Sequence, residues 1–233
     1  MKEKLVLVPG LGGDEGLWFF QIKHLSDIAN IVVPDLSECG SRADMADKIL
    51  ASVPGQFALA GVSMGGWVGF KVAAQAPERI TKFAAIGTWA RMASGAENTQ
   101  RKILKQIKDG SLDEFLESNL TYAISLRRRN DKKFVGFLKN ATSQMKADVM
   151  IRHLEATMND FDSSDLLPKI KCPTLVIAGR DDLIFSVEEH EYIAESIDGA
   201  RLAIVDDSGH ILPFERPQAL SALLRYWLMY FSV

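Results

Sequence analysis

A serine between two glycines is the residue of this chain that is best placed to do chemistry. The segment Gly61-Val62-Ser63-Met64-Gly65 directly follows the apolar run 57–60. Glycines two positions before and two after a serine predict a sharp turn from a strand into a helix, because they let the helix pack close to the strand. Such a turn would present the hydroxyl of Ser63 as a nucleophile at the end of the strand.

A serine hydroxyl needs a base to take its proton, and His210 is the histidine in the best position to be that base. It follows the short apolar run 202–205. We therefore expect it on a loop at the carboxyl end of a strand, where open α/β sheets place their chemistry. The other histidines, His24, His153 and His190, lie in helical or charged stretches, and we expect them to be solvated or packing residues.

Two neighbouring aspartates compete to be the carboxylate that orients the imidazole. Asp181 and Asp182 follow the predicted strand 173–178 and its terminal Gly179, between the serine and the histidine in chain order. The third residue beyond the glycine is the usual position of the acid, which favours Asp182. Asp181 would then be a solvated neighbour or a partner of Arg180.

The elements that must position these residues alternate along the chain. Strands are expected near residues 4–8, 30–34, 57–61, 82–87, 173–178 and 202–205. Helical patterns separate them, which predicts a parallel sheet with helices on both faces. From about residue 90 to 165, apolar residues recur only at spacings of three or four, so this stretch is expected to form a helical cap over the strand ends. Helices that merely lengthen the outer layer are the alternative, and the apolar segment 223–231 is expected to pack on the sheet as the last helix.

These motifs, in this order, resemble the α/β-hydrolase fold family, and more narrowly its small cap-bearing esterases such as the pimeloyl-carrier-protein methyl ester esterases. Residues 5–12 look like the first strand and oxyanion loop, 33–36 like the end of the next strand, and 209–217 like the C-terminal signature. The resemblance covers nearly the whole chain. It implies one domain over residues 1–233, with a mostly parallel sheet flanked by helices and a helical cap insertion at about 90–165.

The resemblance also implies roles for individual residues. The oxyanion hole would be the backbone N–H groups of Leu11 and Met64, which would stabilise the negative charge that builds up in acyl transfer. No metal or organic cofactor is implied. Pro9 replaces the histidine that often precedes the oxyanion loop, so the hydrogen bond of that imidazole is expected to be absent. Trp89, after the strand at 83–86, is expected in the apolar substrate pocket, whereas Trp67 is at least as well explained as core.

The residues predict a serine hydrolase of small carboxylic esters, with Ser63, His210 and Asp182 as its catalytic triad. Carbon–carbon, lactone or thioester hydrolysis, or cofactor-free perhydrolysis, could use the same groups. A non-catalytic hydrolase-fold binding protein is a further alternative. A dinucleotide-binding oxidoreductase is suggested by the glycines at 10–16 with Asp35, but their spacing and the acidic residues beside them count against it.

The composition fits one α/β domain. The chain has 233 residues, of which 47% are hydrophobic, and a net charge of −3, which argues against disorder and gives no reason to expect nucleic acid as a partner. Two cysteines are too few for a disulfide framework. The first apolar run is too short for a signal peptide and no stretch is long enough to span a membrane, so cytoplasmic residence is expected.

A basic cluster, Arg127–Arg129 with Lys132 and Lys133, stands out in this slightly acidic chain. Such a run is usually a solvated face. The alternative is that it steers an anionic or carrier-bound ester substrate toward the serine.

Overall fold

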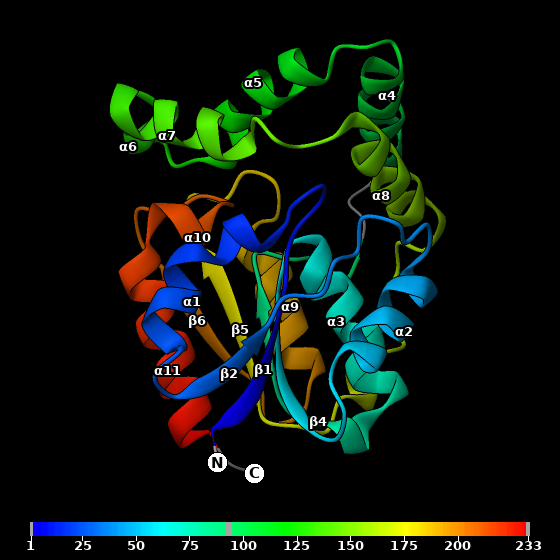
Figure 1. Cartoon of the computed structure of the whole chain (residues 1–233), viewed down its shortest axis with the longest axis vertical. Helices are drawn as coiled ribbons and strands as arrows, with labels where there is room; N and C mark the ends of the chain where they lie inside the picture. The colour runs from blue at the N-terminus through cyan, green and yellow to red at the C-terminus, as the bar shows by residue number, and fades with distance from the viewer. Residues whose placement is uncertain (1, 92–94, 232–233) are drawn as a thin grey trace.

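Six parallel strands form the centre of the computed structural model, which describes residues 2–91 and 95–231 (Figure 1). They are β1 (Glu3–Val8), β2 (Ala29–Val32), β3 (Phe57–Val62), β4 (Ile80–Ile86), β5 (Thr174–Gly179) and β6 (Arg201–Val205). Their order across the sheet is β2-β1-β3-β4-β5-β6. Each strand overlaps one of the runs predicted from the sequence. The order reverses between β1 and β3, and such a switch point is where open α/β sheets bind ligands, at the carboxyl ends of the strands.

Helices cover both faces of the sheet because successive strand residues point to opposite sides. Leu5 and Leu7 of β1 belong to the core beneath one helical layer, and Val6 and Val8 to the core beneath the other. The first layer contains α1 (Phe19–Leu25) and α11 (Pro217–Tyr230), and the second contains α2 (Arg42–Ser52), α3 (Met64–Gln75) and α9 (Val187–Ser196). The C-terminal segment thus packs on the sheet as predicted, with Trp227 fully buried.

The helices between β4 and β5 lie over the carboxyl ends of the strands rather than in the outer layer (Figure 1). These cap helices are α4 (Ala96–Lys108), α5 (Leu112–Ala123), α6 (Leu126–Arg129), α7 (Lys132–Thr142) and α8 (Ala147–Asn159). Ile107, Phe115, Met150 and Leu154 form a small core shared by α4, α5 and α8. The predicted cap range includes residues 92–94, which lie outside the described residues, and the extent of the domain, 1–233, stays a prediction.

The remaining elements are single turns. They are η1 (Glu15–Trp18), η2 (Pro77–Arg79), η3 (Leu167–Lys169) and α10 (Leu212–Glu215). Within residues 2–91 and 95–231, no helix combines the length and the apolar character needed to cross a bilayer.

The turn from β3 into α3 leaves no space for side chains at its two glycines. A Cβ atom on Gly61 would lie 2.2 Å from the carbonyl oxygen of Gly65. A Cβ atom on Gly65 would lie 2.2 Å from the carbonyl oxygen of Val8 in β1. Both obstacles are backbone atoms that cannot move aside as a flexible side chain would. The close packing of α3 on the sheet therefore requires glycine at both positions.

We predict that Gly65→Ala lowers the free energy of unfolding by about 2–3 kcal/mol or more, because the added methyl group overpacks rigid backbone. Gly136→Ala is the matched control: Gly136 lies in α7 with no atom within 4 Å of an added Cβ, and alanine there should stabilise the protein by about 0.5–1 kcal/mol. Urea unfolding followed by circular dichroism measures both. Equal stability of Gly65→Ala and the wild type would contradict the close approach.

Candidate active site

Ser63 lies between β3 and α3 in a strained backbone conformation, with φ 54° and ψ −120°. Such angles are rare for a residue with a side chain. Two hydrogen bonds hold them: the N–H of Ser63 donates to the carbonyl of Ile86 at 2.9 Å, and its own carbonyl accepts from Thr88 Oγ1 at 2.8 Å. The turn leaves the Ser63 hydroxyl in the wall of a cavity.

The loops after β3, β5 and β6 bring Ser63, Asp182 and His210 together. His210 Nε2 lies 3.0 Å from Ser63 Oγ, and His210 Nδ1 lies 2.9 Å from Asp182 Oδ2. A neutral imidazole that donates from Nδ1 to the carboxylate can accept the serine proton at Nε2. The arrangement can therefore activate a serine hydroxyl as a nucleophile.

Asp182 is held in its charged form by the groups around it. Burial alone would raise the pKa of the carboxyl group, but the charge and hydrogen bond of His210 and the backbone N–H groups of Phe185 and Ile184 lower the pKa below its usual range. Those two N–H groups donate to Oδ1 at 3.0 and 2.8 Å. The carboxylate that faces the imidazole is thus both ionised and fixed in orientation.

Asp181 does not take part in this arrangement. Its backbone N–H donates to the carbonyl of Ser208 at 2.9 Å. Arg180 forms its ion pair with Asp206, so of the two alternatives for Asp181 the structure fits a neighbour of the triad rather than an ion-pair partner of Arg180. Residue 206 follows β6, and the sequence offered no sign that its side chain would reach back to the β5 loop.

The loop of His210 is bonded to the cap. The N–H groups of His210 and Ile211 both donate to the carbonyl of Ala123, the last residue of α5, at 2.8 and 3.2 Å. A Cβ atom on Gly209 would lie 2.8 Å from the same carbonyl oxygen. Backbone contact between the cap and the loop therefore sets the position of the histidine.

A buried glutamate completes this junction. Glu215 accepts the N–H of Ser125, from the cap, at 2.9 Å and the N–H of Gly209 at 2.5 Å, each on a different carboxylate oxygen. Burial raises the pKa of Glu215, while hydrogen bonds from Ser125 and Gly209 oppose the rise. Sequence reasoning placed Glu215 in the C-terminal signature of the resemblance without a role, since its partners are backbone groups that carry no sequence signal.

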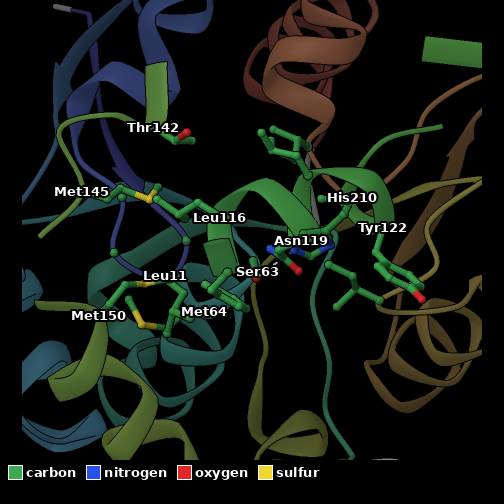
Figure 2. Close-up of a pocket in the computed structure, with 18 of the residues that line it drawn as sticks. Leu11, Ser63, Met64, Leu116, Asn119, Tyr122, Thr142, Met145, Met150 and His210 are labelled. Carbon is green, nitrogen blue, oxygen red and sulfur yellow. Dashed lines mark hydrogen bonds between the residues drawn. The ribbon is translucent and has the colours of Figure 1, made fainter. Parts of the chain in front are cut away.

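Leu11 and Met64 both line the cavity next to Ser63 (Figure 2). Leu11 lies in a loop that the N–H of Gly13 closes by donating to the carbonyl of Gly10 at 3.0 Å. Met64 is the first residue of α3, and the first N–H groups of a helix have no acceptor within it. The loop passes so close that a Cβ atom on Gly10 would lie 3.3 Å from Ser63 Cβ. These two segments can present N–H groups to an oxygen bound at Ser63.

The cavity has a volume of about 710 Å³ and lies between the cap helices and the carboxyl ends of the strands. Its apolar wall includes Ile103, Phe115, Leu116, Leu138, Met145 and Met150. In the view of Figure 2, Leu116, Met145 and Met150 lie on one side of Ser63, and Asn119, Tyr122 and His210 on the other. The described residues that line the cavity include no lysine or arginine, and Asp14 is the acidic residue among them.

No group of three His, Cys, Asp or Glu that could hold a metal occurs in residues 2–91 and 95–231.

The two tryptophans that the sequence singled out have different positions. Trp89 lines the cavity and stacks between Trp67 and Phe185, with ring centroids at 5.7 and 5.0 Å. Trp67 is fully buried, and its indole N–H donates to the carbonyl of Asp160 at 2.8 Å. Both tryptophans belong to one buried cluster, and of the two only Trp89 lines the cavity.

Two other histidines are buried and bonded to backbone groups, as packing residues are. His190 Nε2 accepts the N–H of Thr88 at 3.0 Å, and His153 Nδ1 accepts the N–H of Gly12 at 3.2 Å. Burial lowers the pKa of both imidazoles. Sequence reasoning missed that each supports a segment beside Ser63, because partners 102 and 141 residues away leave no local pattern.

Aspartates neutralise part of the basic cluster. Arg127 and Arg216 both pair with Asp207, at 2.9 and 3.2 Å, and Arg128 pairs with Asp131 at 3.0 Å. Among the described lining residues of the 710 Å³ cavity, none comes from the cluster. The pair of Arg127 with Asp207 joins the cap to the loop before His210, whereas the pair of Arg128 with Asp131 lies within the cap.

Comparisons with known proteins agree with the fold. A family model described as the alpha/beta hydrolase family matches residues 5–223. Proteins that bear the name carbamate hydrolase RutD, from Rhizobium rhizogenes and Azorhizobium caulinodans, are 24% and 27% identical to the chain and align with 92% and 94% of it, and with 88% and 89% of their own lengths. An esterase from Thermogutta terrifontis superposes with a TM-score of 0.87 at 24% identity, over 98% of this chain and 90% of its own. The enol-lactonase from Burkholderia xenovorans superposes with a TM-score of 0.88 at 20% identity, over 99% and 92%.

We predict that Glu215→Gln lowers the free energy of unfolding by about 1–3 kcal/mol, because the amide has one oxygen and would turn its NH₂ group toward a buried backbone N–H. Glu191→Gln is the control, since Glu191 is exposed in α9. Thermal or urea denaturation at neutral pH measures both variants. A Glu215→Gln protein as stable as the control would show that the two N–H groups do not depend on the carboxylate.

Proposed function

The chain belongs to the alpha/beta hydrolase family, and on that premise we propose that this enzyme is a serine hydrolase that cleaves uncharged carboxylic esters through an acyl-enzyme intermediate. The observation that carries the proposal is the continuous hydrogen-bonded series from Ser63 through His210 to Asp182, at the wall of a large apolar cavity. Family membership gives hydrolysis, and the ester substrate and the residue roles are the proposed part.

In the first half of the reaction, Ser63 Oγ attacks the ester carbonyl carbon while His210 Nε2 takes the hydroxyl proton. Asp182 stabilises the imidazolium that forms. The carbonyl oxygen becomes negatively charged, and the N–H groups of Leu11 and Met64 stabilise it as fixed dipoles. When the carbon–oxygen bond to the alcohol breaks, His210 returns its proton to the leaving alcohol, and the acyl group remains on Ser63.

In the second half, water replaces the alcohol. His210 takes a proton from the water as its oxygen attacks the acyl carbon, and the same N–H groups stabilise the second oxyanion. The bond to Ser63 Oγ breaks, His210 returns the proton to the serine, and the carboxylic acid leaves. Neither half uses a metal or an organic cofactor.

The lining of the cavity supports an uncharged acyl group. A substrate carboxylate that entered the cavity would lose its hydration. The described lining residues include no lysine or arginine to pair with it, and burying an unpaired charge is costly. The volume of about 710 Å³ is in the range of sites for whole small molecules. Trp89 and the methionines offer apolar contact, and Asn119 and Thr142 can hydrogen-bond a neutral polar group.

The same attack can occur at other carbonyl groups. The relatives from Rhizobium and Azorhizobium are named for carbamate hydrolysis and the Burkholderia protein for an enol-lactone. An extended apolar wall favours esters with a hydrocarbon acyl chain over compact carbamates, because only a hydrocarbon chain would cover the wall.

Cytoplasmic residence of the protein stays a prediction.

We predict that Ser63→Ala and His210→Ala each lower kcat for a p-nitrophenyl ester by several orders of magnitude, because the residues of a triad act as a unit. Circular dichroism should show that both variants stay folded. Retention of more than about a tenth of the wild-type rate in Ser63→Ala would exclude the serine mechanism, given how large such losses normally are.

The neighbouring aspartates serve as each other's control. Asp182→Asn should lower kcat by about 10³ to 10⁴, the loss expected when the imidazole is held in the wrong tautomer. Asp181→Asn should change it little. The reverse result would make Asp181 the acid of the triad.

We predict that the enzyme prefers neutral esters. A p-nitrophenyl alkanoate of medium chain length should have a kcat/KM at least about tenfold above that of an ester of equal length with a terminal carboxylate, because part of the cost of desolvating the charge is lost in binding. A p-nitrophenyl carbamate completes the panel. A preference for the anionic ester that weakens between about 20 and 500 mM salt would instead indicate steering by the basic cluster 127–133.

A further inference from the structure

The loop that carries Leu11 receives a hydrogen bond from the cap. Pro9 stands where related sequences often have a histidine, so the hydrogen bond of that imidazole was expected to be absent. A different imidazole bonds to this loop. His153, in the cap helix α8, accepts the backbone N–H of Gly12 at Nδ1, at a distance of 3.2 Å.

The second ring nitrogen of His153 fixes its protonation. Nε2 lies 3.0 Å from the carbonyl oxygen of Leu36, which can only accept. Nδ1 must therefore accept and Nε2 must donate, which a neutral imidazole protonated at Nε2 does and an imidazolium cannot. The residue is 1% exposed, and burial lowers the pKa of the ring, so the ring is uncharged and its orientation is set from both ends.

A second residue of α8 presses on the same point of the loop. Gly12 has φ +65°, and a Cβ atom on it would lie 2.6 Å from Met150 Sδ. Met150 and His153 are three residues apart, on one face of the helix. The loop thus meets α8 at Gly12 through close packing against Met150 and a hydrogen bond to His153, and the Leu11 side chain packs on the cap core that contains Met150.

We propose that His153 is a positioning residue that holds the oxyanion loop from the cap, so that the Leu11 N–H points at the reacting oxygen. The inference rests on the proposed function, in which that N–H stabilises the oxyanion. Gly12 N–H belongs to the peptide group directly after Leu11, and fixing it restricts rotation of the backbone at Leu11. A donor that is fixed before the reaction stabilises charge without having to reorganise, and a displacement of about 1 Å can cost about 10²-fold in rate.

Two amide substitutions separate the bonds of His153. In His153→Asn, the amide oxygen takes the place of Nδ1 and can accept from Gly12, while the bond to Leu36 is lost. In His153→Gln, the amide nitrogen reaches the place of Nε2 and can donate to Leu36, while the bond to Gly12 is lost. His153→Leu removes both. If the bond to Gly12 positions the loop, kcat for a neutral p-nitrophenyl ester should fall about 10- to 100-fold in the Gln and Leu variants, with KM nearly unchanged, and should stay within about threefold of wild type in Asn.

Arg152 provides the matched control for loss of cap stability. It is the neighbour of His153 in α8 and donates to the carbonyl of Ser37, so it ties the cap to the loop after β2 without touching Gly12. Arg152→Met should lower the melting temperature and leave kcat unchanged. A boronic acid, which forms a tetrahedral adduct with a nucleophilic serine, should bind more weakly to His153→Gln by the same factor as kcat/KM falls.

Three outcomes would overturn the inference: equal kcat in the Asn and Gln variants, a loss of kcat in Arg152→Met as large as in His153→Gln, or unchanged boronic acid binding in His153→Gln. Ser63→Ala separates these from failure of the proposed function. An inactive Ser63→Ala with a fully active His153→Gln rejects the role of His153 alone, whereas an active Ser63→Ala rejects the serine mechanism on which it rests.

Discussion

The strained backbone of Ser63 is the constraint on which the rest of the site depends. Its conformation costs about 1–3 kcal/mol and persists only where the surroundings determine it. The surroundings here form a series: His190 accepts the N–H of Thr88, Thr88 Oγ1 donates to the Ser63 carbonyl, and β4 accepts the Ser63 N–H. The glycines on either side let α3 close against β1 and β3. The orientation of the serine is therefore a property of the sheet and of α9, and not of the five-residue turn alone.

The cap contributes to the site by hydrogen bonds as well as by cavity walls. Ala123 accepts the N–H of His210, Ser125 donates to Glu215, and His153 accepts the N–H of Gly12. The loops of His210 and Leu11, which both lie beside Ser63, are thus bonded to the cap. A cooperative unit of folding includes the elements that share such buried bonds, so the cap and the histidine loop are expected to open together rather than separately.

Much of this arrangement followed from the sequence for a simple geometric reason. Parallel strands end at one edge of a sheet, so residues that directly follow apolar runs, such as Ser63, Asp182 and His210, were expected to meet, and in the structure they do. The cap helices followed from the spacing of apolar residues between 90 and 165. The catalytic roles of Ser63, Asp182 and His210, and the proposed roles of Leu11, Met64 and Trp89, stay predictions. His153, His190 and Glu215 could not be found in the same way, because their partners are backbone groups of distant segments, which any residue type supplies. The ion pair of Arg180 with Asp206 escaped prediction for the related reason that exposed charges have several partners within reach.

The apolar cavity links the proposed chemistry to the proposed substrate. Asp182 is buried, and His210 and two backbone N–H groups favour its charged form. In the proposed reaction, attack by Ser63 would create an imidazolium beside that carboxylate and an oxyanion beside the loop of Leu11. Each new charge would then form next to a group already oriented to stabilise it. A wall of low polarity strengthens these interactions because little water screens them. A substrate that carries its own carboxylate would find no group in this wall that stabilises it. The negative charges of Asp182 and of Asp14, which lines the cavity, would repel it. A cavity suited to charges that exist only during the proposed reaction is thus unfavourable to a substrate that brings its own charge, because its described lining residues include no lysine or arginine to pair with that charge.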